Sequence, residues 1–128
     1  MKLLFIRHGS RERKAGVRDA AQPLKREGKA EVYRLSGVLT QVCDEPTKCF
    51  SSKYTHANDA ARLLLDARGL HQLQVVELDS LTPGSALDSI GAFLGETQSH
   101  IKAGDVAMVV GHEPRLGQLI AEMTSTRI

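Results

Sequence analysis

The feature that most constrains the fold of this chain is the alternation of short apolar runs with segments of helical periodicity. Four runs have strand character, at residues 3–6, 48–51, 73–78 and 106–110. The runs at 3–6 and 106–110 contain no polar residue, which is typical of strands buried on both faces of a parallel sheet. We therefore expect four strands, spread over the length of the chain.

Between these runs, apolar residues recur every three or four positions, as they do on one face of a helix. They are Leu35, Val38, Leu39 and Val42; Ala57, Ala60, Ala61 and Leu64; Leu87, Ile90 and Leu94; and Leu116, Leu119, Ile120 and Met123. Strands that alternate with helices predict an α/β fold, a three-layer sandwich with a mostly parallel sheet. At 128 residues the chain fits a single domain, residues 1–128.

Composition limits the class of protein. Hydrophobic residues make up 41% and charged residues 25% of the chain, which is ordinary globular usage. The apolar run before Arg7 is too short for a signal peptide or a membrane span, so we expect a cytoplasmic protein without a membrane partner. Cys43 and Cys49 lack the spacing of a metal site and are expected to be free thiols.

The charge is unevenly distributed. The net charge is only +2, but residues 1–34 hold ten Lys/Arg and four Asp/Glu, so the N-terminal region is strongly basic. A basic end attracts an anionic ligand or an acidic partner, although a solvated helix face explains it equally well. The basic region does not show the regular aromatic interleaving of a nucleic-acid platform, so we expect no nucleic acid partner.

Two histidines directly follow predicted strands. His8 comes after the first run and His112 after the last, each beside a glycine, Gly9 and Gly111. In open parallel sheets, ligands bind beyond the carboxyl ends of the strands. If the two strands are neighbours, both imidazoles can face one small anion. Taken singly, each histidine could equally be a hydrogen-bonded loop residue.

Arg7 strengthens this interpretation. A planar guanidinium can bind two phosphate oxygens at once and neutralise the charge that develops during phosphoryl transfer. The alternative for Arg7 is a surface ion pair.

These residues also carry a resemblance to a known family. Arg7-His8-Gly9 after an N-terminal strand resembles the signature of the histidine phosphatase superfamily, and the whole chain is similar to its SixA-like phosphohistidine phosphatase branch. Further similar segments follow in the same order, namely Pro23-Leu24 with Gly28, Leu81-Thr82-Pro83 and Gly111-His112-Glu113-Pro114.

The resemblance implies a compact, phosphoglycerate mutase-like fold and a phosphatase mechanism. His8 would be the nucleophile and form a phosphohistidine that water hydrolyses, while His112 and Arg7 line the same pocket. Gly9 and Ser10 would contribute to phosphate binding. A protonated His112 would add positive charge at the transition state. The chain ends at Ile128, earlier after His112 than family members usually do, so we expect a fold that is short at its C-terminus.

No cofactor and no metal are implied, because the five histidines lack a recognisable ligand spacing.

The chain departs from the family pattern at two positions. His56 stands where the family places a second arginine, and Gln22 stands where the branch has an arginine before Pro-Leu. We expect His56 to take part in phosphate binding, with Lys53 as a further cation within reach. The other interpretation is that His56 is an exposed residue at a helix start with no ligand role.

The substrate is expected to be a phosphorylated protein carrying phosphohistidine. A monoester requires an acid to protonate its leaving group, and Glu77, Asp79 and Glu113 are candidates without distinguishing context. Neutral imidazole leaves more readily than an alkoxide, so an N-phosphoryl substrate eases this need. The alternatives are a general phosphomonoesterase acting on a small phosphorylated substrate, and a degenerate phosphate-binding module with little turnover.

Restoring the missing guanidinium tests the role of His56. We predict that His56→Arg raises phosphatase activity at neutral pH, because a permanent cation replaces an imidazole. Phosphatase kinetics at pH 7 measure the effect. Unchanged or lower activity would show that His56 is no impaired substitute for arginine.

Overall fold

A computed structural model of the chain describes residues 2–7, 25–82, 90–112, 117 and 120. These residues form four strands: β1 (Lys2–Arg7), β2 (Lys48–Ser51), β3 (Val75–Glu77) and β4 (Val106–Gly111). They also form the helices α1 (Arg26–Val42), α2 (Thr55–Ala67) and α3 (Ile90–Thr97), and a short 3-10 helix, η2 (Asp79–Leu81). Each of the four predicted strands is confirmed.

The strands form one sheet in the order β1-β4-β2-β3, and all three pairings are parallel. β4 lies inside the sheet, between β1 and β2, and all of its residues are buried. The continuous apolar run at 106–110 therefore occupies the position that requires it.

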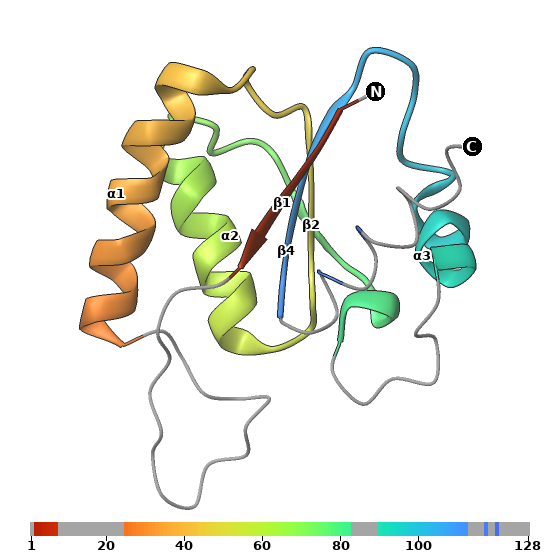
Figure 1. Cartoon of the computed structure of the whole chain (residues 1–128), viewed down its shortest axis with the longest axis horizontal. Coiled ribbons are helices and arrows are strands. Elements are labelled where there is room, and N and C mark those ends of the chain that lie inside the picture. The colour runs from red at the N-terminus through yellow and green to blue at the C-terminus, as the bar shows by residue number, and fades with distance from the viewer. Residues whose placement is uncertain (1, 8–24, 83–89, 113–116, 118–119, 121–128) are drawn as a thin grey trace, which may run out of the picture.

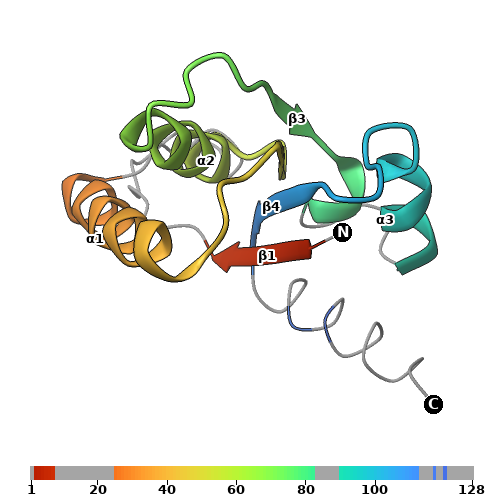
Figure 2. The ribbon, with the colours of Figure 1, turned by 90° about the horizontal axis from the view of Figure 1, so that it is seen from above.

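Helices cover both faces of the sheet, which makes the predicted three-layer sandwich. α1 and α2 lie on one face and α3 on the other (Figures 1 and 2). Side chains alternate along β4, since Met108 and Val110 belong to one hydrophobic cluster and Ala107 and Val109 to the other. The first cluster includes Ile6, Val32, Cys49, Ala57, Ala60, Ala61, Leu64, Leu65 and Leu70, and the second includes Phe50, Leu78, Leu81 and Phe93.

Small side chains let α2 lie close to the sheet. Ala57, Ala60 and Ala61 are fully buried in its inner face. The helix ends at Ala67, and the chain turns away at Gly69, whose φ of +74° is a left-handed conformation that glycine adopts without a steric penalty. Arg62 then holds the connection to β3, because its guanidinium donates to the carbonyl oxygens of Leu73 at 2.6 Å and Leu70 at 3.0 Å.

The helices agree with the periodicity in kind but not always in extent. α1 begins at Arg26, well before the apolar pattern at Leu35, because Val32 extends the buried face toward the N-terminus. Most of the helix expected at 116–123 lies outside the described residues. Within the described part of the chain, no helix has the length and apolar character needed to cross a membrane.

The two thiols should differ sharply in reactivity. Both cysteines are free, and burial raises the pKa of the Cys49 thiol to about 12, whereas Cys43 is only partly buried. Thiolate is the reactive form, so at pH 8 we expect iodoacetamide to modify Cys43 in the native protein and Cys49 only after unfolding. Mass spectrometry of labelled protein measures this, with Cys43→Ser as the control. Rapid labelling of native Cys43→Ser protein would contradict the burial of Cys49.

Candidate functional site

The carboxyl ends of β1, β4 and β2 meet at one edge of the sheet. Arg7 is in register with Gly111, and Ser51 with Val110. Adjacent strands lie about 4.8 Å apart, so the residues that follow these ends are close in space. This edge lies along the lower side of the sheet in Figure 1, where α2 also begins.

His112 is held in place at this edge. It directly follows β4, and its side chain is buried, with 5% of the residue exposed. Its Nε2 lies 2.7 Å from Oγ of Ser52, the residue after β2. The same Oγ accepts a hydrogen bond from the backbone N–H of Tyr54 at 3.2 Å. Two strand ends that are far apart in the sequence are thereby joined through side chains.

Three rings surround this bond. The ring of His112 lies 5.0 Å from that of Tyr54 and 5.0 Å from that of His56, and Tyr54 and His56 are 5.6 Å apart, all measured between ring centroids. All three pairs are edge-to-face, the arrangement that ring quadrupoles favour. The cluster fixes the plane of the His112 imidazole at the end of β4.

The interpretation of His56 as an exposed residue is wrong. His56 lies in the first turn of α2, as expected from its position, but its exposed fraction is 0% and its ring packs against His112. Ala57, the next residue of α2, is also fully buried, so this end of the helix packs against the core. Full burial also means that His56→Arg must accommodate a longer side chain, so its kinetics should be compared with its stability to unfolding.

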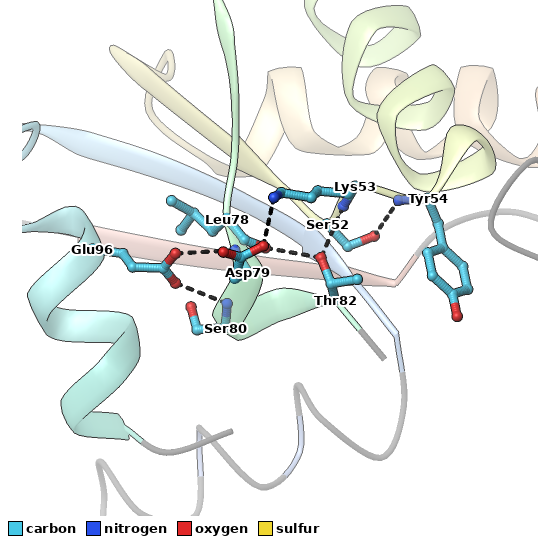
Figure 3. A network of polar contacts seen from close by, with 8 residues as sticks. All are labelled: Ser52, Lys53, Tyr54, Leu78, Asp79, Ser80, Thr82 and Glu96. Atoms are coloured by element: carbon cyan, nitrogen blue, oxygen red, sulfur yellow. Dashed lines mark hydrogen bonds and ion pairs between the residues drawn. The ribbon is translucent and has the colours of Figure 1, made fainter. Parts of the chain in front are cut away.

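Lys53 is directed to a different partner. Its ammonium lies 2.6 Å from a carboxylate oxygen of Asp79, and this hydrogen bond and the charge of Asp79 raise the Lys53 pKa (Figure 3). The backbone N–H of Lys53 donates to the hydroxyl of Thr82 at 3.1 Å. The side chain is half exposed, at 50%, so the ion pair is solvent-screened. Lys53 thus ties the end of β2 to η2, and its charge is partly neutralised by Asp79.

η2 is anchored to the opposite layer by Glu96 of α3. Both carboxylate oxygens accept backbone N–H groups at the start of η2, from Asp79 at 3.0 Å and from Ser80 at 2.8 Å (Figure 3). Hydrogen bonds to an ionised carboxylate are among the stronger ones in proteins. The connection that leaves β3 is therefore held from both sides, by Lys53 and by Glu96.

The remaining predicted residues divide into two groups. His8, Gly9, Ser10, Gln22 and Glu113 lie outside the described residues, so the pairing of His8 with His112 stays a prediction. Arg7 is exposed at the end of β1, and Glu77 accepts a hydrogen bond from the side-chain amide of Asn58 at 2.9 Å.

Sequence reasoning missed Ser52 and Tyr54. Their positions directly after the weakest predicted strand, at 48–51, gave the only signal, because a polar residue at a strand end is common and by itself unspecific. Among the described residues, no group of three His, Cys, Asp or Glu side chains is placed to hold a metal ion.

Comparisons with known proteins identify the fold. No protein-family model and no curated protein matches the chain. Among solved structures, SixA of Nakamurella multipartitia is 23% identical with a TM-score of 0.69, and the match covers 91% of this chain. This chain spans 62% of the length of that SixA chain.

Two further similar structures are of proteins whose named activities differ from that of SixA. A mycobacterial glucosyl-3-phosphoglycerate phosphatase is 17% identical, with a TM-score of 0.70 and coverage of 96% of this chain and 79% of that one. A phosphoglycerate mutase from Bacillus anthracis is 17% identical, with a TM-score of 0.66 and coverage of 98% and 80%. The chain therefore has a SixA-like, phosphoglycerate mutase-like fold, as its motifs predict.

Proposed function

We propose that this chain is a phosphatase that transfers a phosphoryl group to His8 and acts on phosphohistidine in a protein. A nitrogen of His8 forms a bond to phosphorus as the bond to the leaving group breaks. Water then attacks the phosphohistidine and releases phosphate and free His8. Arg7 binds phosphoryl oxygens, and His112 donates a hydrogen bond to the same group.

One observation carries this proposal: β1 and β4 are adjacent and parallel, with Arg7 in register with Gly111. His8 follows Arg7 and His112 follows Gly111 in the chain. The two strand ends therefore bring a guanidinium and a histidine motif to one edge of the sheet, where α/β proteins bind their ligands. Gly9 and Ser10, next in the chain, would complete the phosphate contacts through their backbone.

The enclosed rings support a role for His56 at the same site. The ring centroids of His56 and His112 are 5.0 Å apart. The position that carries arginine in the family motif is therefore occupied here by a ring that packs against His112. An imidazole carries less permanent charge than a guanidinium and forms no bidentate pair with phosphate. His56 would contribute mainly by holding His112, and phosphate binding would depend more heavily on Arg7.

The engaged carboxylates favour an N-phosphoryl substrate. Asp79 is bound to Lys53 and Glu77 to Asn58, so each of these described candidate acids has another partner. A phosphate monoester loses on the order of 10²-fold in rate when no acid is positioned to protonate its alkoxide. Imidazole is a better leaving group and tolerates this arrangement. A small-molecule phosphomonoesterase is the second candidate, because the same fold occurs in a glucosyl-3-phosphoglycerate phosphatase.

The proposed reaction uses only side chains of a single domain. It requires neither a metal ion nor another cofactor, and its partner is a phosphorylated protein. The free thiols Cys43 and Cys49 fit a reducing, cytoplasmic location.

The nucleophile is tested by hydrolysis of 4-nitrophenyl phosphate. We expect His8→Ala to lower kcat by roughly 10³-fold or more, because the covalent route is lost. His71→Ala is the matched control, since His71 is 72% exposed and pairs with Asp66 on the surface. Equal rates for wild type and His8→Ala would remove His8 from the mechanism. Phosphate binding by folded wild-type protein without hydrolysis would instead identify a binding module.

The substrate class is tested with two peptides of the same sequence, one carrying phosphohistidine and one phosphoserine. We expect kcat/KM to be about 10²-fold higher for phosphohistidine, the factor attributed above to a missing acid. Phosphate release measures both reactions, and peptide incubated without enzyme corrects for spontaneous hydrolysis. Equal or higher kcat/KM on the phosphoserine peptide would favour the phosphomonoesterase.

A further inference from the structure

The hydrogen bond between Ser52 and His112 is buried, so each hydrogen-bond donor there needs an acceptor. The exposed fraction is 0% for Ser52 and 5% for His112, and 2.7 Å separates Oγ from Nε2. Buried polar groups are nearly always hydrogen-bonded, because an unsatisfied one costs about 1–3 kcal/mol. The surroundings of Ser52 therefore decide which of the two groups donates.

The other polar groups of Ser52 are already committed. Its backbone N–H donates to the carbonyl oxygen of Val110 at 3.2 Å, and its carbonyl oxygen accepts the hydroxyl of Ser51 at 2.8 Å. Its Oγ accepts the N–H of Tyr54. The hydroxyl proton and the second lone pair of Oγ remain. Among the described residues Nε2 of His112 is the acceptor that the Ser52 hydroxyl reaches, so if Oγ accepted from His112 instead, the buried hydroxyl proton would have no acceptor among these residues. A hydroxyl rotates to suit its acceptor, so this proton is directed to Nε2.

We infer that Ser52 is a positioning residue that donates to Nε2 of His112 and holds this histidine in its neutral form with the proton on Nδ1. A neutral imidazole has one donor and one acceptor nitrogen, and the hydrogen bond at one nitrogen sets the role of the other. Any hydrogen bond that neutral His112 donates therefore leaves from Nδ1.

This inference changes the expected chemistry of His112. A protonated ring would add a full charge at the transition state, but its Nε2–H would compete with the Ser52 proton for the same short contact. The titratable rings that face His112 among the described residues are those of Tyr54 and His56. His112 then acts as an oriented dipole, and Arg7 supplies the permanent charge. This last role rests on the proposed phosphatase function, whereas the tautomer does not.

The tautomer can be measured in the free protein without any substrate. Long-range ¹H–¹⁵N correlation spectra of ¹⁵N-histidine-labelled protein at pH 8 distinguish protonated from unprotonated ring nitrogens, and His112→Gln assigns the signals. We expect Nδ1 of His112 to be protonated and Nε2 to be an unprotonated acceptor. A protonated Nε2 in the wild type would overturn the inference.

Variants of Ser52 test cause and effect. In Ser52→Ala we expect a population with Nε2 protonated to appear, while Ser51→Ala, which removes the neighbouring buried hydroxyl, keeps the wild-type tautomer. Ser52→Thr retains a hydroxyl and should restore the Nδ1–H form. An unchanged His112 spectrum in folded Ser52→Ala would refute the role of Ser52.

Kinetics separate this inference from the proposed function. A wrong tautomer costs roughly 10⁴-fold where a histidine is the general base of a protease triad. Since His112 only donates a hydrogen bond, we expect a smaller loss, about 10- to 100-fold in kcat on 4-nitrophenyl phosphate for Ser52→Ala, with little change in KM. A rise in KM for Ser52→Ala without a fall in kcat would contradict the positioning role. The expected NMR result together with full activity of His8→Ala would leave the tautomer intact and remove the phosphatase mechanism.

Discussion

β4 is hydrogen-bonded on both of its edges and covered by helices on both faces, and the position of the site follows from this burial. Its six residues are all buried, so the strand has no freedom to shift its register against β1 or β2. His112 leaves the end of this strand, next to Arg7 on one side and Ser52 on the other. A rigid central strand thus fixes the spacing of three polar groups that come from different parts of the chain.

The parts of this arrangement that depend on hydrophobic pattern could be predicted from the sequence. The run at 106–110 is apolar throughout because β4 meets protein in every direction. The run at 3–6 is equally apolar, although β1 lies at the end of the strand order and only Ile6 in it is buried. The two runs placed Arg7 and His112 at strand ends. β2 gave a weak signal, because it has only Cys49 and Phe50 as apolar residues. Its burial comes from its neighbours in the sheet rather than from its own composition.

The polar details of the site could not be predicted, because they depend on contacts between distant residues. Ser52 and His112 are separated by 60 positions, and nothing in either local sequence indicates that their side chains meet. The burial of His56 has the same origin, since a histidine in the first turn of a helix is usually solvated. Here the rings of Tyr54 and His112 pack against the ring of His56. Secondary-structure propensity describes a segment in isolation, whereas the burial of these residues depends on tertiary packing.

The start of α1 shows where the chain departs from local stability rules. Lys25, Arg26 and Lys29 lie at the positive end of the helix dipole, and Lys25 provides no side-chain cap. Each cation there costs roughly 0.3–1 kcal/mol, which Glu27, 3.3 Å from Lys25, offsets only in part. Figure 1 places this end of α1 on the same side as the carboxyl ends of the strands. Helix stability does not explain cations in this place. The proposed function does, because these cations would attract an anionic substrate toward Arg7.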